Sequence, residues 1–253
     1  MIHSAYRALL VAHVVFGFVG LVAFWIPVFA AKGGRLHVRT GTAFLWSAYV
    51  VAATAIAICA LSLIRPFGTH PEAMPVGAAD VGAVAGRIRE LAVFLGYLGI
   101  VTLASVHHGV GAMRAGRRVD LLRTPFHTAV HALSFAAGLG VLALGVVDRE
   151  ILFVALSPIG LVGGWSGLRY ARRRPSERMP HWYQHIGGML GGGIAFHTAF
   201  AVFGASRLFD YSLEGTWAIV PWILPSVIGI PAIALWQRHY RAKYEADAEA
   251  VFS

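Results

Sequence analysis

Charged residues are scarce in this chain. Asp, Glu, Lys and Arg make up only 13% of its 253 residues, and hydrophobic residues make up 57%, whereas soluble domains carry about 25% charged residues. The charges fall in clusters, and they leave seven uncharged runs at residues 8–31, 40–64, 91–113, 124–147, 151–168, 179–206 and 215–237. A helix of about 20 such residues crosses the hydrocarbon core of a bilayer. We therefore predict an all-α integral membrane protein, a seven-helix transmembrane bundle that forms a single domain over residues 1–253.

The absence of ionisable residues from these runs excludes several kinds of membrane protein. No Asp, Glu or Lys lies inside any of the seven runs. A retinal Schiff base needs a lysine in the membrane, and carboxylate-based proton or sodium relays need Asp or Glu. Cys59 is the only cysteine, so the chain has neither an intrachain disulfide nor the CxxCH motif that attaches haem covalently.

The basic residues predict how the chain is oriented. The net charge is +9, and 15 of the 21 Lys and Arg residues lie in segments 32–39, 114–123, 169–178 and the tail from 238. Basic residues are concentrated in cytoplasmic loops. This distribution predicts an external N-terminus and a cytoplasmic C-terminus. It also indicates that the positive charge anchors the chain to the lipid bilayer, and we expect no nucleic-acid partner.

Histidine is the polar residue that the apolar runs retain. The chain has 12 histidines, and eight of them lie in the runs: His13, His107, His108, His127, His131, His181, His185 and His197. Neutral imidazole is the commonest metal ligand in proteins, and a polar residue kept inside a membrane span indicates function.

Depth along the helices predicts an inner metal site. At about 1.5 Å per residue, His107 and His131 lie about 10 Å from the inner ends of their runs and His185 lies about 9 Å from its own. We assign these three to the inner site, with His108, His127 and His181 as further candidate ligands. The pairs 127/131 and 181/185 are four residues apart, so each pair shares a helix face. Metal sites built from histidines without carboxylates favour iron, copper or zinc. The alternative for His127 and His181 is contact with headgroups and water, because they lie in the first turns after Pro125 and Pro180.

A second pair of histidines lies in the predicted outer half of the membrane. His13 is about 9 Å and His197 about 15 Å below the outer ends of their runs. We predict that these two residues are axial ligands of one b-type haem.

Glycines four residues apart recur in the fifth and sixth runs. The pairs are Gly160 and Gly164, Gly163 and Gly167, Gly187 and Gly191, and Gly188 and Gly192. Such spacing favours close approach of helix backbones. The alternative is that the glycine faces leave room for a flat cofactor.

Three segments together resemble a bacterial family of multi-pass membrane proteins of unknown function. They are Lys32 to His37 with Gly41, the stretch from Pro180 to His185, and Pro221, Trp222 and Pro225. The resemblance covers most of the chain and implies a multi-pass protein of the bacterial inner (plasma) membrane. The family has no established activity, so it adds no substrate and no catalytic residue.

These observations predict a membrane protein that binds haem b or another transition metal through buried histidines, in electron transfer or redox chemistry. Its expected partner is a membrane redox protein or a second copy of the chain. The sequence leaves open whether it is an enzyme. One alternative is a transporter or permease with a histidine proton relay and a last helix that prolines kink or break. The other is a structural or assembly factor without a cofactor.

Overall fold

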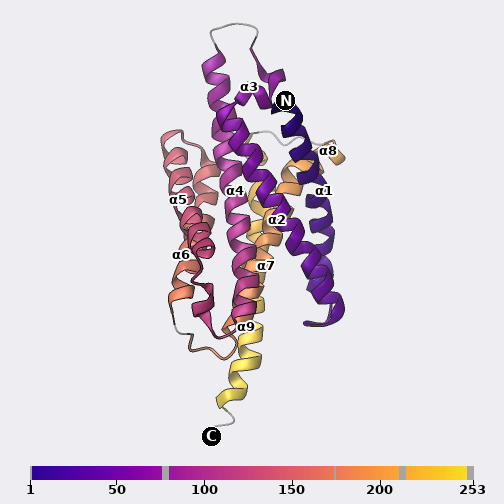
Figure 1. The fold of residues 1–253 in the computed structure, drawn as a ribbon, viewed down its shortest axis with the longest axis vertical. Coiled ribbons are helices and arrows are strands. Elements are labelled where there is room, and N and C mark those ends of the chain that lie inside the picture. Colours follow the sequence, from indigo (N-terminus) through magenta and orange to yellow (C-terminus); the bar gives the residue numbers. More distant parts are fainter. Residues whose placement is uncertain (1, 76–79, 174, 211–214, 250–253) are drawn as a thin grey trace. The chain divides into compact units, whose positions relative to one another are not determined.

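Seven long helices account for most of the chain. The computed structural model describes residues 2–75, 80–173, 175–210 and 215–249 (Figure 1), and every element in these ranges is helical. Seven segments are long and apolar enough to cross a membrane. They comprise α1 (Ile2–Phe29), α2 (Arg35–Ile64), α4 (Val81–Ala115), α5 (Pro125–Val147), α6 (Ile151–Arg172), α7 (Pro180–Ala199) with its continuation to Leu208, and α9 (Val220–Glu249) with the turn that precedes it. The predicted all-α class is confirmed for the described residues, as is the predicted number of helices long and apolar enough to span.

Several helices are longer than the uncharged runs that predicted them. α1 begins at Ile2 rather than residue 8, α4 begins at Val81 rather than residue 91, and α9 continues past residue 237. The runs end where charges begin, but a helix has no reason to end there, because its backbone hydrogen bonds are internal. The sequence predicted the uncharged central part of each helix, and the charged ends extend it.

The chain divides into two compact units, Met1–Leu103 and Ala104–Ser253, with the boundary inside α4. In the first unit, α1 and α2 form an antiparallel helical pair that turns at Gly33. Gly33 has a φ of 78°, a left-handed conformation that glycine adopts without strain. The Lys32 ammonium donates to the carbonyl oxygens of Pro27 and Val28 and so caps the end of α1. Partial burial lowers the pKa of this amine.

In the second unit, α5 and α6 pack side by side (Figure 1). A Cβ added at Gly164 would lie 2.6 Å from the backbone oxygen of His131, so the glycine lets the two backbones approach. Gly188 of α7 similarly faces α4, because its Cβ would lie 2.6 Å from the Cα of Gly109. Close helix packing is therefore confirmed for these two glycines, whose faces neighbouring helices fill.

Proline does not interrupt the last helix. α9 runs unbroken from Val220 to Glu249 with Pro225 and Pro231 inside it. The predicted local break is therefore absent from α9, while a kink at these prolines stays a prediction. The irregular segment lies in the preceding span instead, where α7 continues into a wide π-type turn, η4 (Phe200–Ala205), and a short helix, α8 (Ser206–Leu208).

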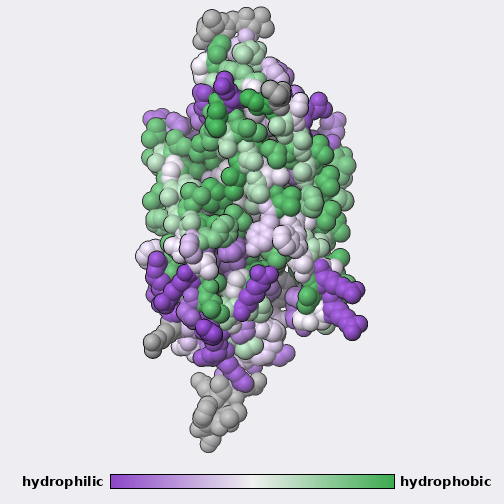
Figure 2. Space-filling model, in the orientation of Figure 1, coloured by the Kyte–Doolittle hydropathy of each residue, from purple (hydrophilic) through white to green (hydrophobic). Residues whose placement is uncertain are grey.

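Apolar side chains cover the outer faces of the helices. Figure 2 shows hydrophobic residues along the helix surfaces and hydrophilic residues gathered at helix ends. Large apolar side chains such as Phe18, Val146 and Leu235 are each more than 60% exposed. Exposed apolar surface on this scale is what lipid contact requires. A multi-pass membrane protein accounts for it, while the orientation of the termini and the single-domain organisation stay predictions.

Candidate metal centre

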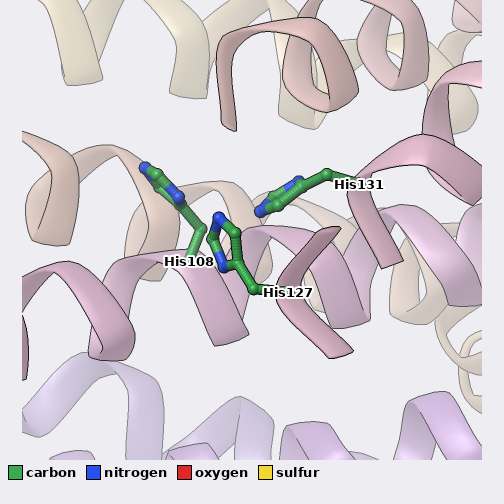
Figure 3. Close-up of side chains that lie close together, drawn as sticks. All are labelled: His108, His127 and His131. Carbon is green, nitrogen blue, oxygen red and sulfur yellow. The ribbon is translucent and has the colours of Figure 1, made fainter. Parts of the chain in front are cut away.

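Three buried histidines of the second unit converge on one point. His108 comes from α4, and His127 and His131 come from α5 (Figure 3). One ring nitrogen of each lies within 4.8 Å of the others. The ring centroids are 4.3 Å apart for His127 and His131, 5.3 Å for His108 and His131, and 5.5 Å for His108 and His127. We call these three residues the histidine triad.

Helix geometry positions the two ligands on α5. His127 and His131 are four residues apart, so they lie on one face of the helix, as the spacing predicts. α5 begins at Pro125, and the Thr124 hydroxyl caps it by accepting from the backbone N–H of His127. His127 is only 1% exposed. Its side chain is therefore buried in the protein and does not contact headgroups and water, which was the alternative for a residue in the first turn.

The triad carries ring nitrogens that have no hydrogen-bond partner in the described part of the chain. Five buried nitrogens of the triad lack a partner among the described residues: both nitrogens of His127, both nitrogens of His131 and Nδ1 of His108. An unsatisfied buried polar group costs about 1–3 kcal/mol, and buried side-chain nitrogens are normally paired. Five such atoms within one cluster are an unusual concentration, and a bound ion would satisfy three of them.

A glutamine fixes the orientation of the third ring. The His108 Nε2–H donates to Oε1 of Gln184 on α7 over 2.9 Å. This bond sets the tautomer, because it leaves the Nδ1 lone pair of His108 directed away from Gln184 and available to an ion. Histidines that bind metals commonly donate their other N–H to an oxygen in this way.

A glycine makes room for the His131 ring. A Cβ added at Gly167 of α6 would lie 2.5–2.6 Å from three atoms of that imidazole. Any residue other than glycine would therefore displace the ring. Gly163, one turn earlier on the same helix, has open space around its Cα. The glycines of this helix thus have separate uses, and Gly167 accommodates an imidazole rather than the edge of a flat cofactor.

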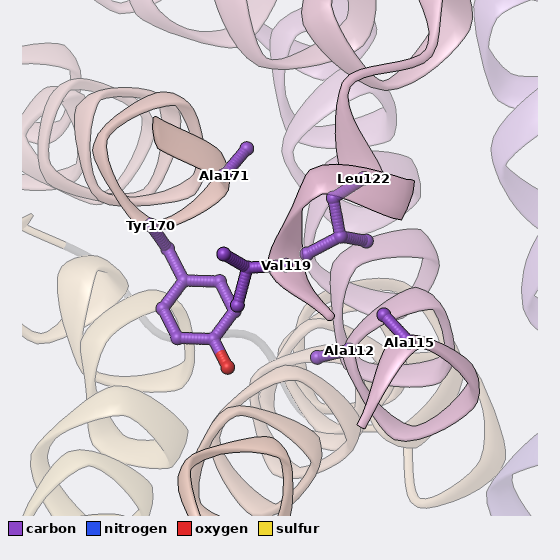
Figure 4. Close-up of a cluster of buried hydrophobic side chains, with 6 residues drawn as sticks. All are labelled: Ala112, Ala115, Val119, Leu122, Tyr170 and Ala171. Atoms are coloured by element: carbon purple, nitrogen blue, oxygen red, sulfur yellow. The ribbon is translucent and has the colours of Figure 1, made fainter. Parts of the chain in front are cut away.

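An apolar cluster closes one side of the centre. Tyr170 and Ala171 of α6 pack against residues of α4 and of the turn η3 (Val119–Leu122), as Figure 4 shows; the cluster comprises Ala112, Ala115, Val119, Leu122, Tyr170 and Ala171. The Tyr170 ring meets His108 edge to face at 5.4 Å between centroids. Its hydroxyl is buried and has no hydrogen-bond partner among the described residues. These contacts hold the His108 ring and keep bulk water away from it.

The other predicted inner-site residues lie outside the triad. His107 is half-buried, and its ring centroid is 5.7 Å from that of His127. The His185 Nδ1–H donates to the carbonyl oxygen of Gly109. His181 has a buried Nδ1 without a partner in the described ranges, but it is not one of the three residues that converge.

The two predicted haem ligands each have a hydrogen-bond partner. In the first unit, the His13 Nδ1–H donates to the carbonyl of Val51 and to Oγ1 of Thr54, each over 3.1 Å. In the second unit, the His197 Nδ1–H donates over 2.7 Å to the carbonyl of Gly193, one turn earlier on its own helix. Their pairing across a haem stays a prediction.

The triad suits a single ion better than a porphyrin. Three rings with centroids 4.3–5.5 Å apart leave no flat space for a macrocycle between any two of them. An ion with metal–nitrogen bonds of about 2.0 Å holds its tetrahedral ligands roughly 3.3 Å apart. The ligand nitrogens lie within 4.8 Å, so small rotations of the side chains would bring all three into contact with one ion. Such an ion would retain an open fourth position.

Comparison with known proteins adds no family. No family model, no curated protein and no solved structure matches the chain.

Proposed function

We propose that this protein is a multi-pass protein of the bacterial inner membrane that binds one transition-metal ion through His108, His127 and His131. The observation that carries the proposal is the group of five buried, unpartnered imidazole nitrogens within the triad. In a membrane span a polar side chain without a partner is costly and indicates function. A metal ion would form one bond with a ring nitrogen of each of the three histidines.

The ligand set limits which metal would bind. Three imidazoles without a carboxylate suit copper, zinc or iron, whereas magnesium and calcium prefer oxygen ligands. Apolar surroundings disfavour a net charge of +2, so either a monovalent copper ion or a divalent ion with an anionic fourth ligand fits best. With copper or iron, the open position and the membrane setting support electron transfer or redox chemistry at the centre.

Elemental analysis tests the proposal. The detergent-purified protein is loaded with copper, zinc or iron(II), and free metal is then removed by gel filtration. We expect about one bound ion per chain, and we expect His131→Ala to lose it because two imidazoles hold such an ion far more weakly. His185→Ala is the matched control, since that histidine also lies in a span but bonds a backbone carbonyl. A wild-type protein that retains no metal, or equal retention by both variants, would contradict the proposal.

A further inference from the structure

A cavity of about 200 Å³ extends to the triad from the loop end of α4 and α5. Its lining includes His107, Arg114, Leu121, Leu122, Thr124 and His127. A water molecule takes up about 30 Å³ of liquid, so the cavity has room for a ligand of several heavy atoms. One of its lining residues, His127, is 1% exposed and belongs to the triad, so the cavity reaches the proposed metal centre.

The charges around the cavity favour an anion. Among the residues that the structure describes, Arg114 is the charged residue in the lining, and no carboxylate contributes to it. The groups packed on the triad are neutral: the Gln184 amide, the Tyr170 phenol and the backbone at Gly167. The Arg173 guanidinium lies over the Tyr170 ring, 5.5 Å from its centroid, and pairs with the Glu177 carboxylate over 2.6 Å. A divalent ion held by three neutral imidazoles therefore has no counter-charge from the protein side chains that surround it.

We infer that this cavity admits a small monoanion, of the size of hydroxide, formate or azide, which binds the metal at the position that the triad leaves open. The inference rests on the proposed function, because the anion needs the ion as its partner. Arg114 at the cavity raises the local concentration of anions and lowers the charge cost of binding. His107 and Thr124 add polar groups to the wall along the path.

Azide binding to the cobalt(II)-loaded protein is the direct test. Cobalt(II) reports a change in its ligands through its visible absorption, and azide is the anionic probe. We expect a saturable spectral change in the wild-type protein. Arg114→Gln should weaken azide binding about fivefold, near the upper limit for an exposed charge, and Arg114→Glu should weaken it further. Added salt should reduce these differences, because it screens exposed charges.

Two controls separate the possible results. Arg118→Glu makes the same charge reversal on an exposed arginine that pairs with Asp120 and lies outside the cavity lining; azide affinity should stay within about twofold of wild type, because screening weakens a more distant charge. Neutral imidazole, used as a second probe, should bind Arg114→Gln as it binds wild type. Failure of the wild-type protein to take up any divalent ion, cobalt included, would overturn the anion site together with its divalent centre, and failure to take up copper as well would contradict the proposed function itself. Cobalt uptake without an azide response, or equal effects of the changes at Arg114 and Arg118, would overturn the anion site alone.

Discussion

The α1–α2 pair of the first unit holds a half-buried histidine and the α5–α6 pair of the second holds two buried ones, and the surroundings of these side chains differ. On α1, His13 donates its Nδ1–H to the carbonyl of Val51 and the hydroxyl of Thr54 on α2. On α5, neither nitrogen of His127 or His131 has a hydrogen-bond partner among the described residues. The imidazoles are chemically identical, and only their surroundings differ.

This difference separates a packing role from a ligand role. A histidine that bonds a backbone carbonyl across a helix interface contributes to helix association, and each such bond is worth about 0.6 kcal/mol in a membrane protein. Two neighbouring histidines without partners make the metal-free protein less stable. A bound ion would remove this cost. The comparison therefore predicts opposite responses to mutation and to metal in the two regions.

The largest expected effect comes from closing the space around one triad ring. Gly167→Ala places a Cβ 2.5–2.6 Å from the His131 imidazole, so the ring must move out of the triad. We expect metal affinity to fall by more than about 100-fold, as for loss of a ligand, and overpacking to destabilise the protein by about 1–3 kcal/mol.

Gly163→Ala is the matched control for this change. It adds the same methyl group on the same helix, but in open space. We expect it to keep metal affinity and thermal stability near the wild-type values. Isothermal titration and thermal unfolding measure both quantities, and equal losses in the two variants would mean that Gly167 serves helix packing alone.

A smaller effect is expected from the residue that orients His108. Gln184→Leu removes the acceptor of the His108 Nε2–H, which frees the ring to change tautomer and rotamer. Loss of such a partner typically costs about 10–100-fold in metal affinity. Gln184→Glu keeps an acceptor oxygen and should retain most of the affinity in the same titration. Wild-type metal affinity in Gln184→Leu would show that Gln184 does not orient His108 for metal binding.

The smallest effect distinguishes the two regions without any metal. In the metal-free protein, His131→Leu removes two unsatisfied buried nitrogens, and we expect it to leave stability unchanged or to raise it by about 1 kcal/mol. His13→Leu removes a hydrogen-bonded imidazole and should lower stability by about 0.5–1.5 kcal/mol. Reversible unfolding in mixed detergent measures both changes. A stability change of the same sign in both variants would show that partnered and unpartnered histidines do not differ in their effect on stability.

Much of the fold follows from the sequence because membrane spans obey a simple rule. The seven uncharged runs predicted the seven long helices, since a bilayer excludes charge over a fixed length. Helix ends were less well predicted, as at Val81, because a helix continues freely into water. The unbroken course of α9 through Pro225 and Pro231 shows that a long apolar helix can contain proline without a break.

The composition of the triad lies beyond what depth along a helix can specify. The sequence correctly placed His127 and His131 on one face, because four residues make about one turn. His107 and His108 differ by one residue, so their side chains point about 100° apart at nearly equal depth. Only the rotation of α4 decides that His108 joins the triad and His107 lines the cavity. Gln184 and Gly167 were missed as partners for the same reason, because contacts between helices decide their roles.

X-ray absorption at the metal edge identifies the atoms that bind the ion. The protein is loaded with one equivalent of zinc or copper, and the fine structure gives the number and distance of its nearest ligands. We expect three imidazole nitrogens at about 2.0–2.1 Å with one further light ligand, and a loss of imidazole scattering in His131→Ala. A spectrum with oxygen ligands alone, or one that His131→Ala leaves unchanged, would contradict a metal centre at the triad.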